Sequence, residues 1–133
     1  MKTFVDTSAF YAVLDRDDSN HQRAKKAWME ILGEYAPVVT TNYVLVETFA
    51  LLQSRLGLEA VRGFQEDVVQ IIQVEFVSRE MHRAGTAAVL SAGRRSLSLV
   101  DCVSFEVMRD SGIRTAFTFD SHFKEQGFDV IPK

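Results

Sequence analysis

Cysteine and proline are almost absent from this chain of 133 residues. The single cysteine, Cys102, excludes an internal disulfide and favours a reducing compartment. Only Pro37 and Pro132 occur and 47% of the residues are apolar, which excludes a disordered chain. No apolar stretch reaches the roughly 18 residues of a membrane span, and the acid at position 6 comes too early for a secretory signal. The sequence therefore predicts a soluble, cytoplasmic protein with no membrane partner, folded as one domain over residues 1–133.

A surplus of positive charge is missing as well. The chain carries 18 acidic and 15 basic residues, a formal net charge of -3. This balance argues mildly against a dedicated nucleic-acid-binding protein, and the argument loses force if a bound metal neutralises several of the acids. The chain also has no glycine-rich phosphate loop, and its three histidines lack the spacing of metal ligands.

Short strands alternate with longer helices along the sequence. The hydrophobic periodicity and the capping residues predict strands at 2–5, 37–40, 74–77, 115–119 and 129–131. They predict helices at 8–14, 19–34, 42–56, 58–72, 79–92 and 98–111. This alternation predicts an α/β fold in three layers, with a central, mostly parallel sheet of four or five short strands flanked by helices.

Four carboxylates stand alone in apolar runs, and no Lys or Arg lies close enough in sequence for a local ion pair. They are Asp6, Glu47, Asp101 and Asp120. Burying an ionised carboxylate without a partner is costly, so such groups are not scattered through a core by chance. Asp6 and Asp120 follow strands, and Glu47 and Asp101 lie in helices next to strands. Because the carboxyl ends of parallel strands share one edge of a sheet, we expect the four to meet there and bind a cation.

Each of the four acids also has a simpler structural explanation. Asp6 can cap a helix, and Asp101 stands three residues after Ser98, as in a capping box. Asp120 ends a strand, where Asp is common in turns. The helix that carries Glu47 is apolar nearly all round and should be buried, unless the long stem of Glu47 reaches solvent. The apolar surroundings favour a functional role for all four.

Other polar residues near the acids are assigned supporting or purely structural roles. We expect hydroxyl groups beside the acids to orient the carboxylates; these are Thr7, Ser8, Ser98 and Ser121. Glu75 and Asp129 also have apolar neighbours, but each lies in a short alternating segment where one side chain points to solvent. They are not counted as site residues. His122 is interpreted as a structural or supporting residue.

A site made only of carboxylates selects Mg²⁺ or Mn²⁺ rather than zinc, which prefers His and Cys. Four carboxylates can hold one ion or two, and the sequence leaves both possibilities open. Such sites usually serve phosphoryl chemistry, because the ion lowers the pKa of a bound water and offsets negative charge on the leaving oxygen. The acids therefore predict a metal-dependent hydrolase that acts on phosphodiester bonds.

Four segments in this order resemble a PIN domain: Val-Asp-Thr-Ser-Ala, the Glu in the helix after the second strand, Leu-Ser-Leu-Val-Asp-Cys, and Phe-Thr-Phe-Asp-Ser-His-Phe. With its small size and with these segments spread over the whole chain, the protein most resembles the VapC ribonuclease toxins of VapBC toxin–antitoxin modules. The resemblance implies a Mg²⁺- or Mn²⁺-dependent endoribonuclease acting on tRNA, rRNA or mRNA, a homodimer, and an antitoxin partner that blocks the site. Asp6, Glu47, Asp101 and Asp120 fall on the family's acidic positions. Ser121 departs from the family, which often has a basic residue there.

Three alternatives accompany this interpretation. The domain can be a PIN-like module that binds RNA or a protein without cutting, or a nuclease that processes RNA without being a toxin. The complete set of four acids argues against the first. A receiver-type phosphoacceptor module is disfavoured, because it needs adjacent acids after the first strand and a lysine after a late strand, and the chain has neither.

Overall fold

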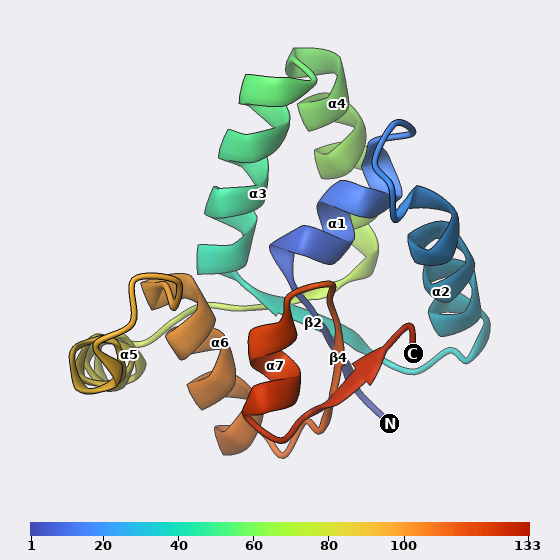
Figure 1. Ribbon diagram of the computed structural model, residues 1–133. Coiled ribbons are helices and arrows are strands. Elements are labelled where there is room, and N and C mark those ends of the chain that lie inside the picture. The colour runs from blue at the N-terminus through green and yellow to red at the C-terminus, as the bar shows by residue number, and fades with distance from the viewer.

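A parallel five-stranded sheet forms the centre of the protein in a computed structural model that describes residues 1–133 (Figure 1). Its strands are β1 (Thr3–Val5), β2 (Val38–Thr41), β3 (Gln73–Glu75), β4 (Thr115–Phe117) and β5 (Asp129–Ile131). They lie in the order β3-β2-β1-β4-β5, and every neighbouring pair is parallel. The predicted α/β class and parallel sheet are confirmed.

Seven α-helices flank this sheet. They are α1 (Thr7–Leu14), α2 (His21–Gly33), α3 (Asn42–Arg55), α4 (Leu58–Gly63), α5 (Arg79–Ala92), α6 (Leu99–Asp110) and α7 (Ser121–Glu125). In Figure 1, α1 to α4 lie at the top and right of the sheet and α5 to α7 lie toward its lower left, so helices flank the sheet on two sides. None of these helices combines the length and the hydropathy that crossing a membrane requires.

Polar caps at the starts of three helices explain why the chain leaves extended structure there. The side chain of Thr41 accepts a hydrogen bond from the backbone of Val44, and Ser78 accepts one from Met81. Ser98 starts α6 in the same way. Each bond satisfies an N–H group that a helix start leaves without a partner. The predicted starts of α3, α5 and α6 are confirmed.

The predicted helix at 58–72 is wrong in its second half. The α-helix ends at Gly63, and the chain continues as a π-helix over Phe64–Val68 and a 3₁₀ turn over Val69–Ile71. Phe64 is fully buried, with its ring 5.0 Å from that of Phe10 and 5.4 Å from that of Phe49. The wider turn keeps Phe64 and Val68 against the core while the residues between them stay exposed.

Two further differences concern the end of the chain. The fourth strand ends at Phe117 rather than 119, because the backbone N–H of Phe119 donates to the Ser8 hydroxyl instead of a neighbouring strand. The short helix α7 was not predicted at all. Because it starts at Ser121, it places Asp120 at a helix N-cap rather than in a simple turn.

The expected burial of α3 is also wrong. Only Val44, Thr48 and Leu52 of this helix are buried, at four-residue spacing along one face. Val46 is 68% exposed, and Glu47 is exposed as well. One face of α3 meets the core and the other is open to solvent, although apolar residues occupy both.

Candidate active site

Asp6, Glu47 and Asp101 lie on the elements that the sequence assigned to them, whereas Asp120 lies at the start of a helix that was not predicted. Asp6 follows β1 directly, and its backbone N–H donates to the Phe117 carbonyl at the end of β4. Asp120 is the N-cap of α7, three residues after β4 ends. Glu47 lies in α3, which starts directly after β2, and Asp101 is the third residue of α6.

Hydrogen bonds from two hydroxyl groups fix the carboxylate of Asp6. Its Oδ2 accepts from Ser8 Oγ at 2.9 Å and from Thr118 Oγ1 at 3.0 Å. Asp6 occupies the N-cap position of α1 but makes no capping hydrogen bond, so the simpler explanation for this residue is wrong. Its Oδ1 accepts no hydrogen bond from the protein. No fully buried side-chain oxygen lacks a partner, so Oδ1 must reach solvent through the 4% of Asp6 that is exposed.

The environment of Asp6 disfavours its charge. Burial raises its pKa from 3.8 to about 6, and the negative charges of Asp101 and Asp120 add to the rise. The hydrogen bonds from Ser8 and Thr118 act in the opposite direction. A carboxylate with a raised pKa beside other acids is typical of functional sites. A bound cation would offset the unfavourable free energy of its negative charge.

Asp101 combines a structural role with a place in the acidic cluster. Its Oδ2 accepts the backbone N–H of Ser98 at 3.1 Å, while the Ser98 hydroxyl accepts the backbone N–H of Asp101 at 3.1 Å. The predicted capping box is confirmed. Burial raises the pKa of Asp101, and the charges of Asp120 and Glu47 raise it further. The capping box holds one oxygen of Asp101, and no hydrogen bond reaches Oδ1.

Asp120 is held at the start of α7. Its Oδ1 accepts the backbone N–H of His122 at 2.9 Å, and its own N–H donates to Thr118 Oγ1 at 2.9 Å. Thr118 therefore bonds both Asp6 and Asp120. The His122 ring bonds Glu125 rather than an acid of the cluster, with 2.6 Å between Nδ1 and Oε1, and this bond raises the pKa of His122 and lowers that of Glu125. The structural interpretation of His122 agrees with this contact.

Glu47 is exposed and makes no hydrogen bond with the protein, unlike the three aspartates. Its negative charge nevertheless contributes to the raised pKa of Asp101. The long stem of Glu47 leaves its carboxylate free to turn.

The donor chemistry of this cluster suits Mg²⁺ or Mn²⁺. Each of the three aspartates uses one carboxylate oxygen for the protein and keeps the other free of protein hydrogen bonds. Carboxylate oxygens held in this way are the ligands that hard divalent ions prefer. No group of three or more Asp, Glu, His or Cys side chains is already arranged to hold an ion. Binding therefore requires side chains to turn toward the ion, and Glu47 has the freedom to do so.

The supporting hydroxyl groups differ from those expected. Ser8 and Ser98 contact the acids as predicted, whereas the Thr7 hydroxyl lies against the Val44 carbonyl of α3 at 3.5 Å and Ser121 is exposed. The residue missed by the sequence interpretation is Thr118, which is 1% exposed. Its signal was a lone hydroxyl between Phe117 and Phe119, two residues before Asp120.

Comparison with known proteins identifies the family. A family model described as "PIN domain" matches residues 3–129, nearly the whole chain. The chain belongs to the PIN-domain family. The resemblance seen in the acidic segments is thereby confirmed over residues 3–129.

Individual relatives of this PIN domain include nuclease toxins. The 23S rRNA-specific endonuclease VapC20 of Mycobacterium tuberculosis is 36% identical over 133 residues, which span 98% of each chain. The crystal structure of VapC20, described as a sarcin–ricin loop cleaving toxin, has a TM-score of 0.84 and 34% identity over 95% of each chain. VapBC2 from Rickettsia felis, solved with a promoter DNA fragment, has a TM-score of 0.72 over 98% of this chain and 97% of the other. Its 11% identity shows a shared fold only.

Proposed function

We propose that this PIN domain is a Mg²⁺- or Mn²⁺-dependent endoribonuclease and the toxin of a VapBC-type pair, with the sarcin–ricin loop of 23S rRNA as its substrate. The observation that carries the proposal is 36% identity to the 23S rRNA-specific endonuclease VapC20 over the full length of both chains. The acidic cluster at the carboxyl edge of the sheet supports it independently. The antitoxin, the homodimer and the cytoplasmic location stay predictions.

In the proposed reaction, Asp6, Glu47 and Asp101 would hold the ion. When bound, the ion makes a water molecule more acidic and offsets negative charge on the phosphodiester. Asp120 orients the attacking water through its free carboxylate oxygen or completes a second ion site. Hydrolysis by water leaves a 5′-phosphate and a 3′-hydroxyl, since the RNA 2′-hydroxyl takes no part.

The side chains around the acids prepare this reaction. Ser8 and Thr118 fix one oxygen of Asp6, and the capping box fixes one oxygen of Asp101, so both carboxylates are oriented before a ligand arrives. Such preorientation lowers the cost of arranging the ligands around the ion. The raised pKa of Asp6 reflects the cost of its charge when no cation is bound.

The first prediction concerns metal dependence and Glu47. The purified protein should cut an RNA hairpin carrying the sarcin–ricin sequence when Mn²⁺ is added, and a chelator should stop the reaction. Glu47→Gln should lower the rate by about 10²-fold, because a mobile ligand loses its charge. Gel analysis of end-labelled RNA measures the rate and identifies the ends of the products.

Glu75→Gln is the matched control, because Glu75 is also exposed and ends β3 at the same edge of the sheet. It should cleave as the unmodified protein does. Cleavage that persists in the chelator or in Glu47→Gln contradicts the proposal. Metal-dependent cleavage that prefers tRNA or mRNA over the hairpin leaves the nuclease role standing and rejects the proposed substrate.

A further inference from the structure

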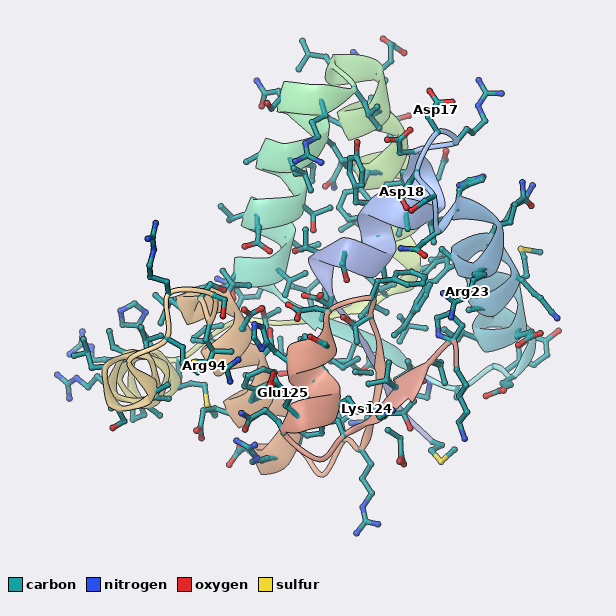
Figure 2. The ribbon with its side chains drawn as sticks, viewed as in Figure 1. Asp17, Asp18, Arg23, Arg94, Lys124 and Glu125 are labelled. Carbon is teal, nitrogen blue, oxygen red and sulfur yellow. The ribbon has the colours of Figure 1, made fainter.

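Three side chains outside the acidic cluster form a continuous link on the surface. Glu125 of α7 receives the His122 ring at 2.6 Å through Oε1 and the Arg94 guanidinium at 3.4 Å through Oε2. Arg94 lies in the loop between α5 and α6, so the link joins segments 31 residues apart. Figure 2 shows Arg94 and Glu125 next to one another at the edge of α7.

One end of this link contacts an acid of the site directly, and the other lies in the loop that leads to a second acid. Arg94 is four residues before Ser98, which caps α6 and holds Asp101 in the capping box. At the other end, the backbone N–H of His122 is the group that Asp120 binds with Oδ1. The starts of α6 and α7, and with them Asp101 and Asp120, are therefore connected through Arg94, Glu125 and His122.

The loop that carries Arg94 has few other attachments. Residues 93–96 are exposed, and Leu97 is the only buried residue between α5 and Ser98. The bonds from Arg94 to Glu125 are the only hydrogen bonds from the loop to an element that does not adjoin it. The side chains of Arg94 and Glu125 are 47% and 44% exposed, and ion pairs this exposed add little to folding stability.

We infer that Arg94 and Glu125 are positioning residues, which set the separation of Asp101 and Asp120 and so determine how tightly the site binds its divalent ion. The inference rests on the proposed metal-binding function. The Arg94–Glu125 ion pair thus affects the positions of the Asp101 and Asp120 carboxylates rather than the folding stability of the protein. Partners that orient metal ligands from behind typically change metal affinity by 10–100-fold when they are removed.

The test is Mn²⁺ binding to the full chain by isothermal titration calorimetry, with the melting temperature measured in parallel. Arg94→Ala and Glu125→Ala should each weaken Mn²⁺ binding by about tenfold, with little change in melting temperature. The double variant should bind about as weakly as either single variant, because both break the same link. Arg94→Lys, which retains the ion pair, should bind like the unmodified protein.

The direction in which Arg94→Ala changes the affinity for Mn²⁺ distinguishes a positioning role from a long-range effect of the Arg94 charge. A long-range charge effect predicts tighter Mn²⁺ binding when the positive Arg94 is removed and weaker binding when the negative Glu125 is removed. Positioning predicts weaker binding in both. Gln126→Ala is the control, because it breaks a second link between α6 and α7, the 2.7 Å bond to Arg109 away from the acids. It should bind like the unmodified protein.

Several results overturn the inference. Unchanged Mn²⁺ binding in Glu125→Ala, tighter binding in Arg94→Ala, or equal weakening in Gln126→Ala each contradicts it while the proposed function stands. An Arg94→Ala variant that binds Mn²⁺ normally but has a raised KM for RNA identifies Arg94 as an RNA contact instead. If the unmodified protein binds no Mn²⁺, the proposed metal-dependent function fails and this inference fails with it.

Discussion

Asp6→Asn is expected to lower RNA cleavage by about 10³-fold and at the same time to make the metal-free protein more stable at neutral pH. The activity falls because a neutral amide replaces a central carboxylate ligand. The stability rises because Asn needs no desolvated charge, and its oxygen can still accept the hydrogen bonds from Ser8 and Thr118. A residue retained for packing would show the opposite effect on stability.

The size of the stability change follows from the pKa of Asp6. An increase from 3.8 to about 6 corresponds to roughly 3 kcal/mol at pH 7. The variant should therefore melt at least about 5 °C higher than the unmodified protein in the presence of a chelator. Calorimetry measures the melting temperature, and the RNA assay measures the rate.

Asp129→Asn serves as the matched control. Asp129 is exposed in β5 and lies outside the acidic cluster. The melting temperature and the activity of the Asp129→Asn variant should therefore equal those of the unmodified protein. An Asp6→Asn variant that keeps cleaving RNA removes Asp6 from the catalytic group. An Asp6→Asn variant that melts at a lower temperature than the unmodified protein contradicts the conclusion that the buried charge of Asp6 destabilises the fold.

The pH dependence of activity and that of stability should run in opposite directions because of Asp6. Below about pH 4, its carboxyl is protonated in both folded and unfolded chains, and the folded state keeps its full stability. Between pH 4 and 6 the unfolded chain ionises while the folded chain stays protonated, so stability falls as the pH rises. Above pH 6 both states are ionised and the loss is complete. The melting difference between Asp6→Asn and the unmodified protein should therefore grow from pH 4 to 6 and then stay constant.

Cleavage should increase over the same pH range. A protonated Asp6 does not bind a cation, so at limiting Mn²⁺ the rate should fall about tenfold for each pH unit below 6. Initial rates measured from pH 5 to 8 at constant ionic strength test this. A rate that is flat between pH 5 and 7, with the melting difference constant over the same range, excludes Asp6 as the group that controls both.

Local sequence signals predicted much of the fold. Thr41, Ser78 and Ser98 act within their own helix turns, so the starts of three helices could be predicted without tertiary information. The sheet followed from short apolar strands that alternate with helices. The five-residue helix α7 was missed because it is too short for a periodic pattern, and its start depends on Asp120.

Burial was harder to predict, because it depends on neighbours that are distant in sequence. The apolar pattern of α3 did not reveal that one of its faces is open to solvent. The π-helix that begins at Phe64 accompanies contacts of this ring with Phe10 and Phe49, which are distant in sequence. Composition and local periodicity contain neither fact.

The candidate site shows the same division. The four acids could be found because each stands among apolar neighbours in the sequence. The groups that hold them could be found only when they were close in sequence, as Ser8 is to Asp6 and Ser98 is to Asp101. Thr118 reaches Asp6 across 112 positions of the chain, through the pairing of β1 with β4. That contact required the sheet topology.

The most direct test of the shared acidic site is a crystal structure with Mn²⁺, using the anomalous scattering of the metal to locate it. An anomalous peak within bonding distance of the Asp6 and Asp101 carboxylates is predicted, with Glu47 turned toward it and Asp120 beside it. A peak bound elsewhere on the protein, or no peak at a concentration of Mn²⁺ that supports RNA cleavage, contradicts the account.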